Sequence, residues 1–342
     1  MGMIDAAEPA VADAAEPAVA DAAEPAVAGT VEPAEAEAVL VSASGLHKSY
    51  GDHHAVRGID IRIRRGEAFG LLGPNGAGKT STMRMLACVS PRSGGELSVL
   101  GLDPDLAGPQ IRARLGVVAQ QDNLDTELNV NQNLLVYGRY FGLSRGHLRE
   151  KSVQLLEFAQ LSDRGDSRVD ALSGGMRRRL TIARSLVNDP EILLLDEPTT
   201  ALDPQARQVV WERLSALKRQ GVTLIITTHY MDEAEQLCDR LAVMDQGRIV
   251  AEGTPAELIE RYSSREVLEL RFPAGDTAQA DAVAGLGDRT EVLADRVLLF
   301  THDAEAALNA VRARGIRPES SLMRRSTLED VYLRITGREL VD

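Results

Sequence analysis

A phosphate-binding pattern carries the clearest chemistry in this 342-residue sequence: Gly73-Pro74-Asn75-Gly76-Ala77-Gly78-Lys79-Thr80. It satisfies G-x-x-x-x-G-K-[ST], follows the apolar run 68–72 and leads into a helix that is expected to begin near Lys79. The glycines allow the backbone to turn its N–H groups toward a polyphosphate, and the helix N-terminus adds a positive dipole end. We expect Lys79 to neutralise β- and γ-phosphate charge and Thr80 to ligate Mg²⁺. The sequence therefore predicts a nucleotide site that includes Ser81.

Two adjacent carboxylates, Asp196 and Glu197, follow the apolar run 192–195. A carboxylate at the end of a buried strand can hold Mg²⁺ or its water. Its neighbour can take a proton from attacking water, a contribution of roughly 10² to 10⁴-fold in rate. We therefore expect Asp196 at the metal and Glu197 as general base. A structural salt bridge is the alternative use of Glu197.

Further polar residues occur in a fixed order around these motifs. The ordered set, which also includes the two motifs above, resembles the ATP-binding subunit of ABC transporters over about residues 41–262. The Leu-Ser-Gly-Gly sequence between the phosphate loop and the two carboxylates is the specific mark of that family. The members of the set that lie outside the two motifs are Tyr50, Gln120, Leu172 to Met176, Ala201 to Asp203, and His229.

The resemblance implies an α/β P-loop NTPase with a mainly parallel sheet, a helical subdomain at about 121–171, and ATP with Mg²⁺ as ligands. It implies that Tyr50 stacks on adenine, that Gln120 senses Mg²⁺ and the attacking water, and that His229 contacts the γ-phosphate. In the same comparison Ser173, Gly174 and Gly175 face the nucleotide of a second ATPase subunit, and Asp203 links the two sites. A Ser-Gly-Gly turn that opens a helix is itself an anion site. On this interpretation two such subunits, expected to be a homodimer, share two composite sites.

A narrower resemblance, to the nodulation-factor export ATP-binding proteins and drug-resistance exporters, involves residues 116–141, 197–200 and 327–339. Ala119, Asn129 and Ala201 depart from that family, which usually has proline, threonine and glycine there. The resemblance implies export of a lipo-oligosaccharide, glycolipid or drug-like compound through a separate ABC-2-type permease. It also places the chain at the cytoplasmic face of the plasma membrane, where the permease would hold it.

Strands and helices alternate through the nucleotide-binding region, which predicts a mostly parallel sheet with crossover helices. Residues 55–64 alternate apolar and polar side chains, as a strand with one solvated face does. From 121 to 169 the period becomes helical. The Arg177 to Arg179 cluster that follows is expected to be a solvated helix face, with contact to a partner or phosphate as the alternative. The expected strands are 68–72, 96–100, 192–195 and 222–227, and the expected helices begin near 79, 131, 148, 177 and 204.

Residues 263–342 carry a second pattern, typical of a small α+β domain. A strand at 268–272, a short helix at 277–284 and a hairpin around Ala294-Asp295 come first. An amphipathic helix follows at 303–314, and a last strand is expected near Leu322. A capping box from Ser326 to Glu329 opens the final helix, which Gly337 ends.

The first 40 residues form an arm that repeats DAAEPAVA three times and holds nine acidic and no basic residues. Its prolines oppose a continuous helix, so we expect a disordered arm, with partner docking as the alternative. The net charge of −13 falls to −4 outside the arm, which gives no support to nucleic-acid binding. No apolar run approaches the roughly 18 residues that span a bilayer. Cys88 and Cys238 are expected in helices as reduced packing residues.

Three other classes of protein are alternatives to the exporter. Signature-containing ATPases that act on DNA or ribosomes have a long coiled coil or two nucleotide domains, whereas this chain has a 50-residue insert and one phosphate loop. A regulatory GTPase is disfavoured because no Asn-Lys-x-Asp sequence occurs. An importer subunit is the nearest transport alternative, and residues 327–339 argue against it.

Overall fold

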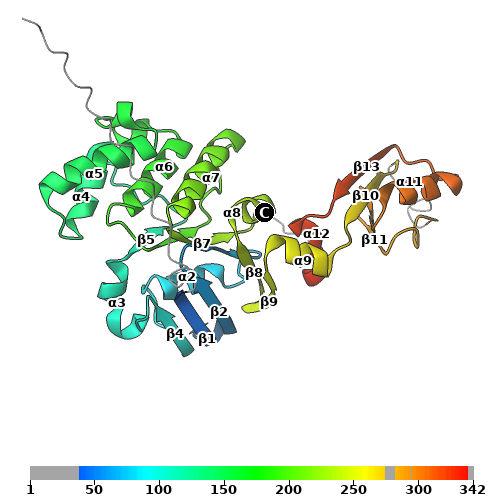
Figure 1. The fold of residues 1–342 in the computed structure, drawn as a ribbon, viewed down its shortest axis with the longest axis horizontal. Helices are drawn as coiled ribbons and strands as arrows, with labels where there is room; N and C mark the ends of the chain where they lie inside the picture. The colour runs from blue at the N-terminus through cyan, green and yellow to red at the C-terminus, as the bar shows by residue number, and fades with distance from the viewer. Residues whose placement is uncertain (1–37, 274–281, 294, 338–342) are drawn as a thin grey trace, which may run out of the picture. The chain divides into compact units, whose positions relative to one another are not determined.

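The computed structural model describes residues 38–273, 282–293 and 295–337 (Figure 1). Its centre is a six-stranded sheet in the order β5-β6-β7-β3-β8-β9. All neighbouring strands run parallel except β8 and β9, as the alternating pattern predicts. The strands are β3 (Ala68–Leu72), β5 (Leu115–Val118), β6 (Ile192–Asp196), β7 (Thr223–Thr228), β8 (Arg240–Asp245) and β9 (Arg248–Gly253).

The central strands are buried on both faces, which explains their continuous apolar runs. Successive side chains of β6 point to opposite faces, so Ile192 and Leu194 join one core cluster, and Leu193 and Leu195 join the other. The first cluster includes side chains of α2 (Lys79–Leu86) and α3 (Pro104–Arg112). The second includes side chains of α6 (Gly174–Ser185), α7 (Pro204–Arg219) and α8 (Met231–Leu237).

An antiparallel sheet in the order β2-β1-β4 completes the first cluster. It consists of β1 (Val39–Tyr50), β2 (His53–Arg64) and β4 (Gly94–Val99). In β2 the buried Ile59, Ile61 and Ile63 alternate with exposed residues, which confirms the predicted strand with one solvated face. Figure 1 shows this sheet on the side of the central sheet away from α5, α6 and α7.

The predicted helical insert is confirmed by α4 (Val130–Arg139) and α5 (Arg145–Phe158), with 3₁₀ turns at Ser162–Arg164 and Val169–Ala171. A capping box opens α4: the Asn129 side chain accepts from the Gln132 backbone, and the Gln132 side chain accepts from the Asn129 backbone. Asn129 is one of the positions at which the sequence departs from the narrower family. Because asparagine is among the best N-cap residues, the departure preserves the helix start.

The C-terminal part forms a second, antiparallel sheet in the order β11-β12-β10-β13, with α11 (Ala304–Ala313) packed against it. Its strands are β10 (Glu266–Arg271), β11 (Arg289–Val292), β12 (Val297–Thr301) and β13 (Ser320–Arg325). These elements confirm the predicted α+β fold, including the hairpin and the last strand near Leu322. Most of the helix expected at 277–284 lies outside the described residues, as do Ala294, the end of the 327–339 segment and residues 1–37 of the arm.

The final helix, α12 (Leu328–Thr336), packs on α8 and α9 (Pro255–Tyr262). Its Leu328, Val331 and Tyr332 belong to the same core cluster as the helices that cover the central sheet. The last helix is therefore an integral part of the nucleotide domain's core, although a second sheet precedes it in the chain.

The capping box of α12 was predicted one residue too early. Thr327 is the N-cap, and Asp330 reaches back to the Thr327 amide at 2.8 Å. Ser326 is not the cap: its hydroxyl donates to the Ser264 carbonyl and accepts from the Ser263 hydroxyl.

Both cysteines were also predicted inside helices, and both lie just beyond one. Cys88 occupies a turn with φ of 54° after α2, and Cys238 is the C-cap of α8. Both are free thiols, and burial raises the pKa of each. In the part of the chain that the structure describes, no helix has the length and apolar character needed to cross a membrane.

Candidate active site

The phosphate loop, residues 73–80, connects β3 to α2, and its glycines are required by contact as well as by conformation. A Cβ on Gly73 would lie 2.3 Å from the Met244 carbonyl oxygen. Gly78 has φ of 106°, and a Cβ there would lie 2.5 Å from the Ala55 carbonyl oxygen. Only glycine relieves both constraints, so the loop can wrap closely enough to turn its backbone N–H groups toward an anion.

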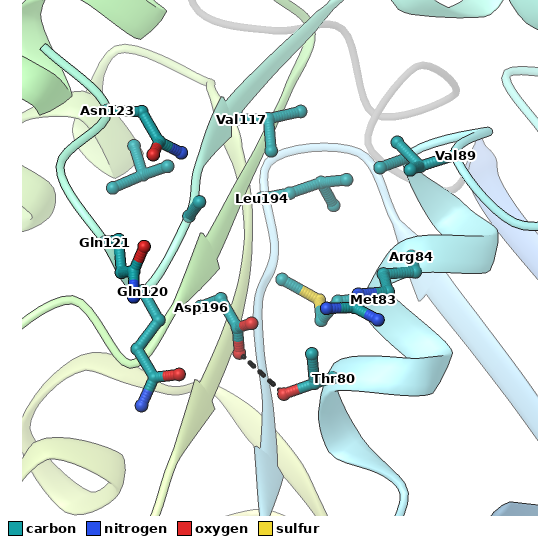
Figure 2. A pocket seen from close by; sticks show the side chains of 13 residues that line it. Thr80, Met83, Arg84, Val89, Val117, Gln120, Gln121, Asn123, Leu194 and Asp196 are labelled. Carbon is teal, nitrogen blue, oxygen red and sulfur yellow. Dashed lines mark hydrogen bonds between the residues drawn. The ribbon is translucent and has the colours of Figure 1, made fainter.

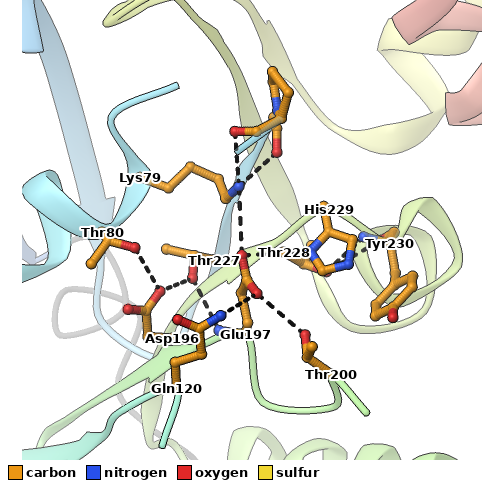
Figure 3. A network of polar contacts seen from close by, with 12 residues as sticks. Lys79, Thr80, Gln120, Asp196, Glu197, Thr200, Thr227, Thr228, His229 and Tyr230 are labelled. Carbon is orange, nitrogen blue, oxygen red and sulfur yellow. Dashed lines mark hydrogen bonds and ion pairs between the residues drawn. The ribbon is translucent and has the colours of Figure 1, made fainter. Parts of the chain in front are cut away.

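Lys79 is 4% exposed and reaches across the loop that it follows. Its Nζ donates to the carbonyls of Gly73 at 2.6 Å and Pro74 at 3.2 Å, and lies 3.7 Å from Glu197 Oε1 (Figure 3). Burial lowers the pKa of Lys79, and the carboxylates of Glu197 and Asp196 oppose that shift. The Lys79 ammonium thus lies between the phosphate loop and the carboxylate of Glu197, the residue that follows β6.

Asp196 lies at the end of β6, where its Oδ1 accepts from Thr80 Oγ1 at 3.4 Å and from Thr227 Oγ1. Parallel strands bring these ends together, because β6 pairs with β7 and Asp196 is opposite Thr227. The hydroxyl of Thr80, the carboxylate of Asp196 and the side-chain oxygen of Gln120 are all hard oxygen donors, the kind that Mg²⁺ prefers. The residues expected at the metal therefore fit it chemically.

Glu197 is 8% exposed and its backbone lies in the left-handed region, with φ of 47°. Such a conformation costs a non-glycine residue about 1–3 kcal/mol and persists where its surroundings over-determine it. Here the Glu197 amide donates to both the carbonyl and the hydroxyl oxygen of Thr227, each at 3.1 Å. The strained backbone aims the carboxylate back toward the phosphate loop.

The Glu197 carboxylate is surrounded by donors (Figure 3). Gln120 Nε2 donates to Oε2 at 3.1 Å and Thr200 Oγ1 donates to it at 3.3 Å, while His229 Nδ1 lies 3.5 Å from Oε1. The hydrogen bond with His229, followed by the charge of Lys79, holds the pKa of Glu197 below its usual value. The group is therefore a carboxylate at neutral pH, the form that can accept a proton.

A cavity of about 220 Å³ joins most of the expected nucleotide residues. Tyr50, a residue that is 43% exposed, contributes one wall, and Lys48 Nζ lies 4.8 Å from the centroid of its ring. A neighbouring cavity of about 420 Å³ shares Thr80 and Gln120 and adds Asp196 and apolar side chains between α2 and the segment after β5 (Figure 2). Besides Tyr50, the first cavity is lined at the expected positions by Pro74, Asn75, Gly76, Ala77, Gly78, Lys79, Thr80, Ser81, Gln120 and Glu197.

The Ser173, Gly174 and Gly175 segment, called the signature turn below, lines neither of these two cavities. Ser173 is the N-cap of α6 and accepts from the Met176 amide at 3.3 Å. Ser173 and Gly174 are exposed, whereas a Cβ on Gly175 would lie 2.8 Å from the Cβ of Ala206 in α7. Asp203 caps α7 next to this contact. The turn is thus presented to solvent, away from the phosphate loop of its own chain.

The expectation that Arg177 to Arg179 form a solvated face is wrong for Arg178, which is 4% exposed and donates to backbone carbonyls on two sides. Its place could have been found from the helical period, because it lies three, four and seven residues before the buried Thr181, Ile182 and Ser185.

A second residue missed from the sequence is the buried Glu233 in α8. Its carboxylate accepts from Thr199 Oγ1 at 2.8 Å and from Trp211 Nε1 at 3.2 Å, and burial raises its pKa. No local signal marks it, because its partners come from other elements.

Comparisons with known proteins agree with this geometry. Residues 56–200 match the ABC transporter family, and residues 276–337 match the C-terminal domain of the nodulation factor export protein NodI. A protein named Nod factor export ATP-binding protein I, from Cupriavidus metallidurans, is 46% identical over 306 residues, 89% of this chain and 99% of that protein. The chain belongs to the NodI family of ABC transporter ATP-binding proteins.

Other relatives and solved structures agree with this membership. A protein of the same name from a Rhizobium species is 46% identical over 88% of this NodI-family chain and 98% of its own length. CbiO1 from Clostridium perfringens, described as part of an ABC transporter complex, superposes with a TM-score of 0.61, 29% identity and coverage of 66% of this chain and 92% of its own. A dimeric ATP-binding cassette in a post-hydrolysis state with ADP and Pi superposes with a TM-score of 0.58 and 27% identity, and the match covers 63% of this chain and 98% of that one.

Membership in this family settles the class of activity. The NodI-family chain binds ATP and is the ATP-hydrolysing subunit of an ABC exporter, a kind of subunit that works with a membrane permease and a second ATP-binding subunit. The NodI-type C-terminal match supports the exporter over the importer and over ATPases that act on nucleic acid.

Proposed function

We propose that Glu197 is the general base of ATP hydrolysis, and that hydrolysis drives export of a lipo-oligosaccharide, glycolipid or drug-like compound through an ABC-2-type permease. The observation that carries the catalytic part is the Glu197 carboxylate itself. It is buried, held ionised by its neighbours, and aimed at the phosphate loop by a strained backbone. A carboxylate in that place can accept the proton of a water that attacks the γ-phosphate.

The other side chains have distinct roles in this proposal. The phosphate loop and Lys79 bind the β- and γ-phosphates, and Tyr50 stacks on adenine. Gln120 and His229, both beside the Glu197 carboxylate, orient the water and the γ-phosphate. Thr80, Asp196 and Gln120 would hold Mg²⁺, which when bound neutralises the charge that develops on the phosphates.

Two copies of the chain would complete each site. Ser173 and Gly174 of the signature turn are exposed, the turn forms the N-terminus of α6, and it lines neither of the two cavities described above. Facing the γ-phosphate of a second copy would use that N-terminus as an anion site. Asp203, at the start of the adjacent helix, would link the two composite sites in a homodimer.

The permease and the cargo are supported by the family and by the helical subdomain. The relatives' name specifies Nod factor export, so a lipo-oligosaccharide is the first cargo to test. The subdomain exposes Val136, Tyr140 and Val153, and Gln120 joins it to the catalytic carboxylate. A shift at the γ-phosphate could thus reach a permease at the cytoplasmic face of the plasma membrane, where the chain would be held peripherally.

Glu197→Gln tests the catalytic assignment. The amide keeps the shape of the side chain but cannot take the proton, so ATP binding should persist and steady-state hydrolysis should fall by roughly 10² to 10⁴-fold. ATP with Mg²⁺ should also stabilise a dimer of this variant, measured by size-exclusion chromatography with light scattering. Glu212→Gln on the exposed face of α7 is the matched control. Near-normal hydrolysis by Glu197→Gln would remove the assignment.

A further inference from the structure

Arg178 connects three parts of the nucleotide domain through its guanidinium. The residue lies on α6, the helix that the signature turn opens. Its Nη1 donates to the carbonyl of Ala119 at 2.6 Å and to that of Gln120 at 3.4 Å. The remaining bonds go to the end of β6 and the residues that follow it: Nη2 to the carbonyls of Asp196 and Glu197, each at 3.1 Å, and Nε to that of Pro198 at 2.7 Å.

The charge of Arg178 is buried, and most of its close acceptors are carbonyl oxygens rather than carboxylates. Asp122 Oδ1 lies 3.5 Å from Nη1, and burial lowers the pKa of the guanidinium while Asp122 opposes the shift. A buried charge is costly unless its donors are satisfied. Here carbonyl oxygens accept from Nε and from both Nη atoms, and a planar fork fits that arrangement better than an ammonium would.

The carbonyls that Arg178 binds belong to the residues proposed to do the chemistry. Gln120 and Glu197 both present their backbone oxygen to it, and their side chains bond to each other at 3.1 Å. Glu197 also has the strained backbone, and Arg178 donates to the carbonyls of the peptides on both sides of it. A single side chain therefore fixes the backbone from which both functional groups project.

We propose that Arg178 is a positioning residue that holds Gln120 and Glu197 in register with each other and with the signature helix. The proposal rests on the roles proposed above for Gln120 and Glu197. It implies that a movement of the signature turn, which would face the nucleotide of the second subunit, is transmitted by a rigid link to the catalytic carboxylate of its own chain. The two composite sites would then be coupled through α6 as well as through Asp203.

Arg178→Met and Arg178→Lys in the full-length chain test the proposal. Methionine keeps much of the apolar stem but removes every donor, so single-turnover hydrolysis should fall about 10- to 100-fold while the Kd for ATP stays within about threefold. A lysine ammonium can reach the carbonyls of only one of the two segments, either 119–120 or 196–198, so the rate of Arg178→Lys should lie between those of Arg178→Met and wild type. The rate, the Kd and the Tm are measured for each variant, and the lysine variant serves if methionine prevents folding.

Arg179→Met is the matched control. Arg179 is the next residue of the same helix and also donates to protein acceptors, the Ala159 carbonyl at 2.7 Å and Gln160 Oε1 at 2.9 Å, but these lie within the helical subdomain. Its hydrolysis rate should stay within about threefold of wild type, even if its Tm falls.

Two outcomes would overturn the inference. One is a hydrolysis rate for Arg178→Met equal to that of Arg179→Met. The other is a loss of rate matched by an equal loss of ATP affinity and no recovery in Arg178→Lys, which is what a purely structural residue would give. Glu197→Gln is measured in the same series: if it hydrolyses ATP normally the proposed function fails, whereas an inactive Glu197→Gln beside an active Arg178→Met removes only this inference.

Discussion

Leu328→Ala tests whether the last helix of the chain stabilises the nucleotide domain. Leu328 opens α12 and is 1% exposed. It shares a core cluster with Leu237 of α8 and Leu258 of α9, and its amide donates to the Glu235 carboxylate at 2.7 Å. Removal of its side chain would therefore leave a cavity against helices that belong to the nucleotide domain.

The size of the effect follows from the burial. Truncation of a fully buried leucine to alanine costs about 2–5 kcal/mol, because the lost transfer free energy adds to the cavity that remains. That is a large share of the roughly 5–15 kcal/mol by which a folded domain is stable. With a urea slope of about 3 kcal/mol/M, a loss of about 3 kcal/mol would lower the unfolding midpoint by about 1 M.

Trp211 provides the assay. It is the one tryptophan of the sequence, lies on α7 and packs against the same cluster, so its fluorescence reports unfolding of the nucleotide domain. Leu328→Ala should shift that transition although residue 328 lies far along the chain. Leu322→Ala is the control, since Leu322 in β13 is 55% exposed and its truncation should change stability by about 0.5 kcal/mol or less. Equal Trp211 transitions in the two variants would refute the packing argument.

Two further predictions concern buried groups near the site. Burial raises the pKa of Glu233 above its ordinary value of about 4.3, so the stability that its protonated form contributes is complete below about pH 4.3 and is lost as the pH rises through the raised pKa. The urea midpoint of Glu233→Gln should therefore fall less from pH 5 to pH 8 than the wild-type midpoint does. Parallel pH curves for the two proteins would contradict this expectation. Gly175→Ala should lower the free energy of unfolding by about 1–3 kcal/mol, because the new Cβ would lie 2.8 Å from the Cβ of Ala206. Gly174→Ala is the control, since a Cβ there meets nothing within 4 Å. Equal thermal midpoints for the two variants would show that α6 and α7 can separate without cost.

The sequence predicted the parts of the site that are defined by local spacing. The phosphate loop requires its glycines and Lys79 at fixed offsets, and Asp196 and Glu197 follow a recognisable buried strand. Parallel strand pairing then brings the ends of β3, β6 and β7 together, so residues chosen along the chain also meet in space.

Groups whose partners lie far away in the chain could not be predicted in this way. Arg178 stands in a run of three arginines that suggests a solvated face. The helical period could have shown that it is buried, but its acceptors, some 20 and 59 residues away in the chain, carry no local signal. The left-handed backbone of Glu197 likewise depends on Thr227 of another strand. The start of α12 was misplaced by one residue because Ser326 and Thr327 are both favoured N-cap residues, and contacts of Ser326 with Ser263 and Ser264 decide between them.

α8 connects the catalytic region to the C-terminal helix. The helix begins two residues after His229, and its Glu233 binds Thr199, which lies two residues after Glu197. Two residues further on, the Glu235 carboxylate accepts from the Leu328 amide in the first turn of α12. The segment that carries the expected γ-phosphate contact is thus held from the catalytic side by one glutamate and from the C-terminal side by another. Because both contacts act on a seven-residue helix, a change at α12 reaches the His229 segment through a short and well-packed path.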